Sequence, residues 1–244
     1  MGGSNSRVEY HTVHVIPPET QKLLTQQTQQ LQKYDGEAKK LADPELYKTN
    51  ATNLLNNFIA GLHNLKLTDF IKKNAGEKHI GLIGPISSGK TTLINVMFDK
   101  KLNVALGHCT EKCEVVHSEN GIIIWDICGQ NDDYAFYNPE SLSFIKSLDL
   151  CVVTFDNDVA MISNILKVVH KLNPKGIIAV RTKVDQCDSS NIRTIEEEKK
   201  LDVQKITNLL GSSVEIYCIS SRNVDRVLPN IYDWNILKNT ILKK

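Results

Sequence analysis

The stretch Gly84-Pro85-Ile86-Ser87-Ser88-Gly89-Lys90-Thr91 fits the phosphate-binding pattern G-x-x-x-x-G-K-[ST]. An apolar run at 79–83 precedes it, and apolar residues recur at helical spacing from 91 to 98, so a strand and a helix are predicted on its two sides. In such a loop, backbone N–H groups converge on phosphate oxygens, Lys90 supplies a positive charge and the Thr91 hydroxyl ligates Mg²⁺. The alternative, a chance turn, is opposed by the motifs that follow. The predicted phosphate-site residues are Gly84, Ser87, Ser88, Gly89, Lys90, Thr91 and Thr92.

A second motif follows the apolar run 122–125. The residues Asp126-Ile127-Cys128-Gly129-Gln130 have the form D-x-x-G, in which we expect Asp126 to hold Mg²⁺ through water and the Gly129 amide to bond the γ-phosphate. That bond exists only while the terminal phosphate is present, so an order-disorder switch is predicted for 130–137. Thr110 is the candidate to complete the Mg²⁺ coordination, and the alternative that it has no metal role stays open.

A third motif, Thr182-Lys183-Val184-Asp185, follows the apolar run 176–180 and indicates base recognition. Asp185 can accept hydrogen bonds from both the ring N–H and the exocyclic amine of guanine, which adenine does not match. The Lys183 stem is expected along the base plane. A fourth segment, 218–223, comes after a predicted strand and supplies Ser220 and Ser221 as weaker candidates for contact with the guanine carbonyl. A solvated turn is the alternative for the third motif by itself.

In this order the motifs resemble the GTPase domain of the immunity-related (interferon-inducible) GTPases, over roughly residues 45–244. The most specific parts are the run 180–185, with Thr182 where most GTPases have Asn, and Ser220-Ser221-Arg222-Asn223. The resemblance implies a dynamin-like protein that binds GTP and GDP and hydrolyses GTP slowly as a monomer. It also implies self-association in the GTP state and action on intracellular membranes. By position, the implied nucleotide residues are Gly84, Gly89, Lys90, Thr91, Asp126, Gly129, Thr182, Lys183, Asp185 and Ser220.

Two departures from the family pattern change these expectations. Family members usually continue into a sizeable C-terminal helical region, whereas this sequence ends at Lys244, which predicts a compact or truncated relative. The motif around Trp125, Asp126 and Gly129 has Gln130 next, which resembles Arf-like small GTPases and α subunits of heterotrimeric G proteins. In those proteins the glutamine orients the attacking water. Lys90, Gln130 and Thr110 are therefore the catalytic candidates, with a solvent-facing Gln130 as the alternative.

Composition limits the classes of function. The chain has 244 residues and a formal net charge of +1, which gives no electrostatic case for a nucleic-acid partner. The sequence holds no apolar stretch of the roughly 20 residues that a membrane-spanning helix needs, so we expect a cytoplasmic protein that is peripheral on membranes. The 6 cysteines lack C-x-x-C spacing and are predicted to be reduced and mostly buried. Mg²⁺ is the only metal expected.

The N-terminus carries a second signal. Met1 to Ser6 fits M-G-x-x-x-[ST], so Gly2 is a candidate for N-myristoylation, and an unmodified terminus is the alternative. One myristoyl chain gives only marginal membrane binding, and no dense basic patch follows. Avidity from self-association, or from association with related GTPases, is therefore expected to hold the protein on an intracellular membrane.

The alternation of strand and helix patterns predicts an α/β fold, a P-loop GTPase domain at 77–244 with a mostly parallel central sheet flanked by helices. Residues 1–76 are predicted to form an N-terminal segment with a polar helix at 19–40 and an apolar-faced helix after Pro44 that packs on the domain. The predicted strands are 79–83, 113–117, 121–126, 148–155, 177–181 and 214–219, and the predicted helices are 90–98, 140–147, 160–172, 193–210 and 233–242. The functional loops then all follow the carboxyl ends of strands.

Three functions compete. The preferred one is a membrane-associated GTPase that switches or assembles with GTP, with a possible place in cell-autonomous immunity implied by the resemblance. A guanine-nucleotide-binding scaffold or decoy without meaningful turnover is the second. An Arf-like switch is the third, favoured by Gln130 and Gly2 but opposed by Thr182 and the long N-terminal segment. A P-loop kinase would leave the run 182–185 unexplained.

Overall fold

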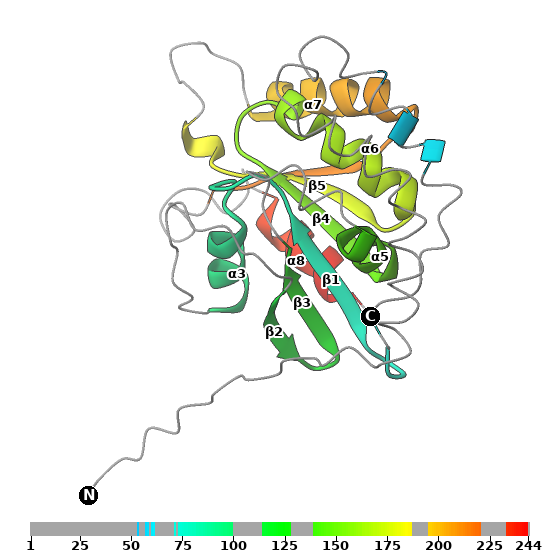
Figure 1. The fold of residues 1–244 in the computed structure, drawn as a ribbon. Coiled ribbons are helices and arrows are strands. Elements are labelled where there is room, and N and C mark those ends of the chain that lie inside the picture. The colour runs from blue at the N-terminus through cyan, green and yellow to red at the C-terminus, as the bar shows by residue number, and fades with distance from the viewer. Residues whose placement is uncertain are drawn as a thin grey trace, which may run out of the picture.

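The computed structural model describes residues 53, 57–58, 60–61, 71, 73–99, 114–127, 139–186, 195–220 and 233–243. Its strands form one six-stranded sheet in the order β2-β3-β1-β4-β5-β6, and helices cover the sheet (Figure 1). The elements in chain order are β1 (Lys78–Ile83), α3 (Lys90–Phe98), β2 (Glu114–Glu119), β3 (Ile122–Asp126), α5 (Pro139–Ser147), β4 (Leu150–Phe155), η1 (Val159–Ile162), α6 (Ser163–Leu172), β5 (Ile177–Arg181), η2 (Val184–Gln186), α7 (Ile195–Leu210), β6 (Glu215–Cys218) and α8 (Trp234–Leu242).

The sheet is parallel except at one edge. β1 pairs in parallel with β3 on one side and β4 on the other, and β4, β5 and β6 continue in parallel. β2 runs antiparallel to β3, and the two are joined through Asn120 (φ 53°) and Gly121 (φ 77°). Two consecutive positive φ values are what a two-residue type I′ hairpin turn requires, and Asn-Gly is its preferred sequence. The prediction of a mostly parallel α/β sheet is confirmed.

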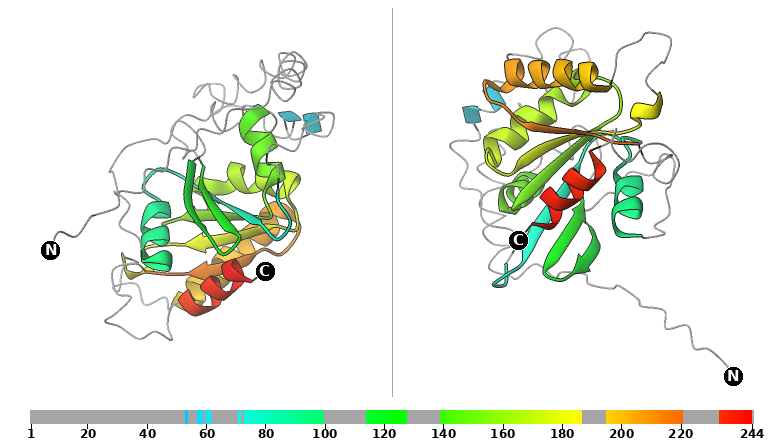
Figure 2. Two further views of the ribbon diagram at one scale, coloured as in Figure 1. Left: turned by 90° about the horizontal axis from the view of Figure 1, so that it is seen from below. Right: turned by 180° about the vertical axis from the view of Figure 1, so that it is seen from behind.

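Two apolar layers lie on opposite faces of the sheet. Successive strand residues point to opposite faces, so Val152 of β4 joins the layer with α3 and α8, while its neighbour Val153 joins the layer with α5, α6 and α7. Figure 2 shows α3 and α8 together on one face of the sheet, away from α5, α6 and α7. The strands β1, β4 and β5 are buried on both faces, which explains why the sequence shows continuous apolar runs there instead of alternation.

The helices follow their apolar spacing. In α6 the buried residues Ile165, Leu166, Val168 and Val169 repeat at helical spacing. The predicted helix 160–172 begins instead with the 3₁₀ turn η1, whose first free N–H, from Ala160, is capped by the Asp158 carboxylate at 3.1 Å. In the N-terminal segment, the helical residue Phe58 is 1% exposed and lies in the core cluster with α5 and α6. Packing of this segment on the domain is therefore confirmed at Phe58.

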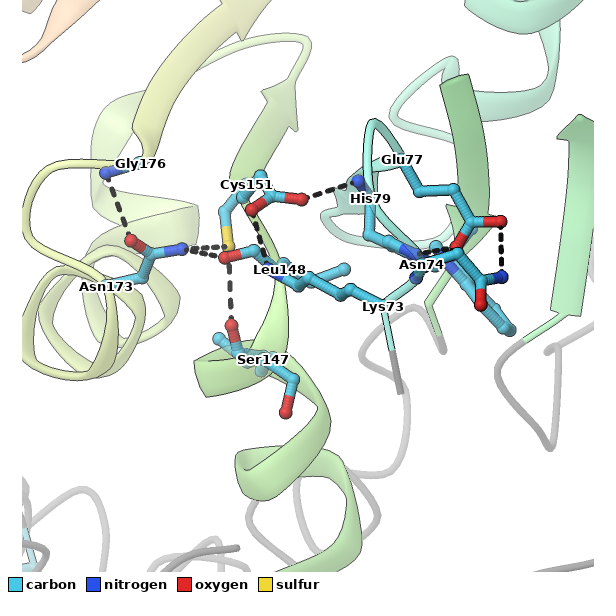
Figure 3. Close-up of polar contacts among 12 residues, drawn as sticks. Lys73, Asn74, Glu77, His79, Ser147, Leu148, Cys151, Asn173 and Gly176 are labelled. Carbon is cyan, nitrogen blue, oxygen red and sulfur yellow. Dashed lines mark hydrogen bonds and ion pairs between the residues drawn. The ribbon is translucent and has the colours of Figure 1, made fainter. Parts of the chain in front are cut away.

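At the amino ends of the parallel strands, side chains form hydrogen bonds with backbone groups that do not pair within the sheet (Figure 3). Asp149 Oδ2 accepts a hydrogen bond from the His79 N–H at 2.7 Å, which ties the turn before β4 to β1. Asn173 donates to the Leu148 carbonyl at 2.8 Å and accepts from the Gly176 N–H at 3.1 Å. A Cβ on Gly176 would lie 2.4 Å from the Asp149 carbonyl oxygen, so only glycine fits there. At this amino edge, hydrogen bonds within the chain therefore satisfy these backbone groups.

The last helix is fixed to the same edge. Lys78, the first residue of β1, donates from Nζ to the carbonyls of Ile241 at 3.0 Å and of Lys243 at 2.7 Å. Free carbonyls at a helix C-terminus favour a cation, so this lysine caps α8. Partial burial lowers the pKa of Lys78, and the nearby Asp149 carboxylate opposes that shift.

Candidate nucleotide site

The predicted site residues converge at the carboxyl edge of the sheet. The connection after β1 places α3 on one face of the sheet, and the connection from β3 to β4 places α5 on the other, which makes the carboxyl end of β1 a topological switch point. The loop 84–89 follows β1, and Thr182 to Asp185 follow β5. Ser220 lies just beyond β6. For the described residues, the prediction that the functional loops follow carboxyl ends of strands is confirmed.

The loop after β1 has the backbone of an anion cradle. Ser87 (φ 62°) and Gly89 (φ 86°) both adopt the left-handed conformation, and α3 begins immediately afterwards at Lys90. Gly89 is the N-cap of α3 and has no side chain with which to cap it, so the first N–H groups of the helix need an acceptor from elsewhere. The first turn of α3, which is described throughout, contains no acidic residue. A phosphate group meets this demand, and the helix dipole favours its charge.

Lys90 lies across this loop. Its ammonium group donates to the carbonyls of Gly84 at 2.9 Å and Pro85 at 3.0 Å, and the residue is 8% exposed. These contacts hold the charge beside the backbone that would surround the phosphates. The loop therefore fits the predicted phosphate group in both shape and charge.

Polar contacts beneath the loop anchor it to β4. The Ser88 hydroxyl lies 2.6 Å from the Thr154 hydroxyl, and both residues are fully buried. Thr154 also donates to the Ile83 carbonyl at 3.3 Å. A Cβ on Gly84 would lie 2.4 Å from the Thr154 carbonyl oxygen, so β4 approaches the loop too closely for any side chain there. The Ser88 side chain thus faces β4, and its predicted contact with nucleotide is left to its backbone.

The residues expected to hold Mg²⁺ lie next to this loop. Asp126 is the last residue of β3, and its partner across the sheet is Leu82 of β1, two residues before Gly84. Its carboxylate is half-buried, with Oδ1 shielded from solvent. Thr91 lies in the first turn of α3. A hydroxyl and a carboxylate are oxygen donors of the type that Mg²⁺ prefers, so these two residues fit the ion.

The base-recognition loop is tied to the phosphate loop by one side chain. The Thr182 hydroxyl donates to the Ser88 carbonyl at 2.8 Å and lies 3.2 Å from the Phe155 carbonyl. Thr182 is 1% exposed, so this hydroxyl is used inside the protein. A Cβ on Gly89 would lie 3.2 Å from the same hydroxyl. Thr182 therefore sets the distance between the two loops.

The two residues of the third motif that are predicted to contact guanine, Asp185 and Lys183, are each held by a partner. The Asp185 carboxylate accepts a hydrogen bond from the Ser220 hydroxyl at 2.5 Å, which joins the loop after β5 to the loop after β6. Lys183 adopts a left-handed conformation (φ 53°), and its ammonium pairs with Asp156 at 2.8 Å. The Trp234 indole N–H fixes the Ser220 carbonyl at 2.9 Å. Asp185 and Ser220 are thus brought together as predicted.

Three supporting residues were missed by sequence reasoning. Thr154 could have been found as a polar residue inside the apolar strand 150–155. Asp156 directly follows that strand, at the edge where the site was expected. Trp234 is the first residue of α8, and its sequence position gives no sign that its indole N–H bonds to Ser220.

Several predicted residues lie outside the described part of the chain: Thr110, Gly129, Gln130, Ser221 and Gly2. Cys151 and Cys218, the cysteines that are described, are free and buried as predicted, and burial raises the pKa of each thiol to about 12. Among the described residues, no group of three His, Cys, Asp or Glu side chains could hold a metal ion. Within the same residues, none of the helices has the length and apolar character to cross a membrane.

The sequence model of the family described as "50S ribosome-binding GTPase" matches residues 79–183. Protein SEY1 homolog 2 of Entamoeba histolytica and that of Entamoeba dispar are each 29% identical over 130 residues, which cover 45% of this chain and 15% of the relative. The chain thus spans a small part of the relatives' length.

Solved structures that resemble this chain include a probable GTP-binding protein engB and a variant of Aquifex aeolicus Era bound to GDP.AlF4-. The engB chain has a TM-score of 0.47 at 18% identity, with 67% of this chain and 96% of that chain covered. The Era chain has the same TM-score and identity, with 67% and 55% covered. The resemblance to immunity-related GTPases remains a prediction. The described residues have the P-loop GTPase fold, and their loops fit a guanine nucleotide with Mg²⁺.

Proposed function

We propose that this protein binds GTP at the carboxyl edge of its sheet, hydrolyses it slowly as a monomer, and works on an intracellular membrane in a self-associated state. The observation that carries the nucleotide part is the 2.8 Å hydrogen bond from Thr182 to the Ser88 carbonyl. It joins the base loop and the phosphate loop into one unit, so one nucleotide can be held at both ends. Loops fixed in this way lower the ordering cost of binding.

The chain's own residues supply most of what phosphoryl transfer needs. The loop 84–89, the N-terminus of α3 and Lys90 hold and orient the phosphates, and Asp126 with Thr91 would hold Mg²⁺. Bound Mg²⁺ neutralises charge that develops on the phosphate oxygens. Catalysis in this class rests largely on such positioning. Gln130 is the proposed residue for orienting the attacking water.

Membrane residence and self-association are proposed from the sequence. The pattern from Met1 to Ser6 makes Gly2 a myristoylation candidate, and the motif order resembles a family whose members assemble in the GTP state. One acyl chain binds a membrane only weakly, so assembly would supply the avidity. A role in cell-autonomous immunity follows from the same resemblance and from nothing else.

The deciding experiment is GTP turnover per molecule over a wide range of protein concentration, with Mg²⁺ present and ATP as the control nucleotide. Specific activity that rises with concentration supports self-association. A flat, slow rate instead favours an Arf-like switch. Binding of GTP without turnover favours a guanine-nucleotide-dependent scaffold or decoy.

Base recognition has its own test. Replacing Asp185 with Asn should move preference from guanine toward xanthine nucleotides, because the carboxylate no longer accepts both guanine N–H donors. Competition between GTP and XTP for the variant measures the shift. An unchanged preference would remove Asp185 from the base site.

A further inference from the structure

A buried ion cluster lies directly behind the base-recognition loop. Arg181, the last residue of β5, donates from Nη1 to Glu198 at 2.9 Å and to Asp202 at 2.8 Å, both on α7. The side chains of Arg181 and Asp202 are 7% and 2% exposed, and that of Glu198 is 25% exposed. Such clusters are often no more stabilising than apolar residues of similar volume, so stability by itself does not account for this one.

The Arg181 backbone lies where the base-contacting segments meet. Its carbonyl accepts a hydrogen bond from the Ile219 N–H at 2.9 Å, next to Ser220. Across the sheet it pairs with Phe155 on one side and with Cys218 on the other. The base loop starts at the very next residue, Thr182. A shift of Arg181 would therefore move the loops after β5 and β6 together.

The same turn of α7 also holds the strand that leads to Ser220. Lys199 donates from Nζ to Asp233 Oδ2 at 2.7 Å, and that oxygen accepts the Cys218 N–H at 2.8 Å. Glu198 and Asp202 thus hold β5 directly, and Lys199 of the same helix holds β6 through Asp233. The Asp185–Ser220 hydrogen bond joins the two loops that follow these strands.

We infer that Arg181 is a positioning residue for guanine recognition. Its ion pairs to Glu198 and Asp202 fix the end of β5, and they thereby hold Asp185 where its carboxylate can accept both guanine N–H donors. The inference rests on the proposed GTP binding and adds a specificity role for a residue that does not touch the nucleotide. Its mechanical reason is that Nη1 belongs to a planar, rigid guanidinium, so its N–H groups point to Glu198 and Asp202 in fixed directions.

The test compares GTP with ITP, whose base keeps the ring N–H but lacks the exocyclic amine. A misplaced Asp185 loses more binding free energy with GTP, which offers two donor groups, than with ITP, which offers one. The ratio of the ITP to the GTP dissociation constant should therefore fall. Arg181→Lys keeps the charge and removes the planar group that fixes the direction of the two hydrogen bonds. Glu198→Gln weakens the cluster at its most exposed member. This milder variant keeps the test available if Arg181→Lys does not fold. We expect the ratio to fall by on the order of tenfold for Arg181→Lys and by less for Glu198→Gln.

Lys205→Gln is the matched control. Lys205 lies on the same helix, α7, and forms an exposed ion pair at 3.0 Å with Asp158, the residue before η1. It should leave the ratio unchanged. The inference is overturned if folded Arg181→Lys and Glu198→Gln proteins keep the wild-type ratio, or if both dissociation constants rise equally. Failure of the proposed function is a separate result, because the wild-type protein would then not prefer GTP over ITP and ATP at all.

Discussion

The two edges of the central sheet are built from similar residues but differ in what their polar groups bind. At the amino edge, Asp149, Asn173 and Lys78 bond backbone groups of the protein itself. At the carboxyl edge, Ser87 and Gly89 take left-handed conformations, and the N–H groups at the start of α3 point into a loop with no side-chain cap. The amino edge thus holds the fold, and the carboxyl edge keeps backbone donors for a ligand. The difference teaches that side chains bond the backbone groups of the structural edge, whereas the functional edge leaves the start of α3 without a side-chain cap.

The largest expected effect falls on the carboxyl edge. Lys90→Met should weaken GTP binding by about 100-fold, because a charged hydrogen bond from a buried lysine to phosphate is lost. The free energy of unfolding should change little, since the bonds of this lysine to Gly84 and Pro85 lie within one loop. Titration of labelled GTP and urea unfolding measure the two quantities. Lys175→Met, an exposed lysine in the turn before β5, is the control, and equal weakening by both variants would contradict the contrast between edges.

A change at the amino edge should lower stability and leave GTP affinity unchanged, the reverse of the Lys90 variant. Asp149→Ala removes the acceptor of the His79 N–H, which should lower the free energy of unfolding by about 2 kcal/mol. GTP affinity of the folded fraction should remain at the wild-type value. Asp149→Asn is the control, because its side-chain oxygen still accepts that hydrogen bond. A loss of GTP affinity on Asp149→Ala, measured where the variant is folded, would show that the edges are coupled.

Thr182 tests the link within the functional edge. Thr182→Val keeps the shape and removes the hydroxyl that bonds the Ser88 carbonyl, which should cost about 1 kcal/mol and weaken GTP binding about fivefold. Thr182→Ser keeps the hydroxyl and should stay near wild type. Calorimetric titration compares the three proteins. Wild-type affinity in the valine variant would mean that the two loops are positioned independently of this bond.

The smallest effect is a pH dependence at the amino edge. His79 is buried, and burial lowers its pKa against the opposing influence of Glu77 and Asp149, with Lys73 adding to the lowering. The Trp125 indole N–H donates to His79 Nδ1 at 3.1 Å, so a proton at Nδ1 would break that bond. Below the unfolded-state pKa of 6.5, the unfolded chain takes up the proton more readily than the folded one.

Stability should therefore fall as the pH drops, by no more than about 0.7 kcal/mol between about pH 7 and pH 6 from this group. Urea unfolding at the two pH values measures it, and His79→Gln should remove most of the change. Nucleotide binding should not follow the same curve. A pH-dependent GTP affinity that disappears in His79→Gln would connect the buried histidine to the site.

The sequence by itself determined the elements and the motif positions. Strands 79–83 and 177–181 were predicted within a residue of their bounds, because a sheet buried on both faces needs continuous apolar runs that are visible locally. The phosphate loop was found because its glycines and lysine meet requirements that are local in the chain. The 3₁₀ turn that begins at Val159 was missed, because the apolar spacing of these residues fits an α-helix equally well. The cap by Asp158 that starts the 3₁₀ turn is visible only in the structure.

Only the tertiary structure decided how the motifs are held together. Thr182 bonds Ser88 across 94 positions of sequence, and no local pattern indicates that its hydroxyl is used there and not on the base. The same holds for the bond between Ser88 and Thr154 and for the Arg181 ion pairs with α7. The physical reason is that the sequence specifies which groups must be buried or bonded, whereas the sheet order decides which groups are close enough to bond one another.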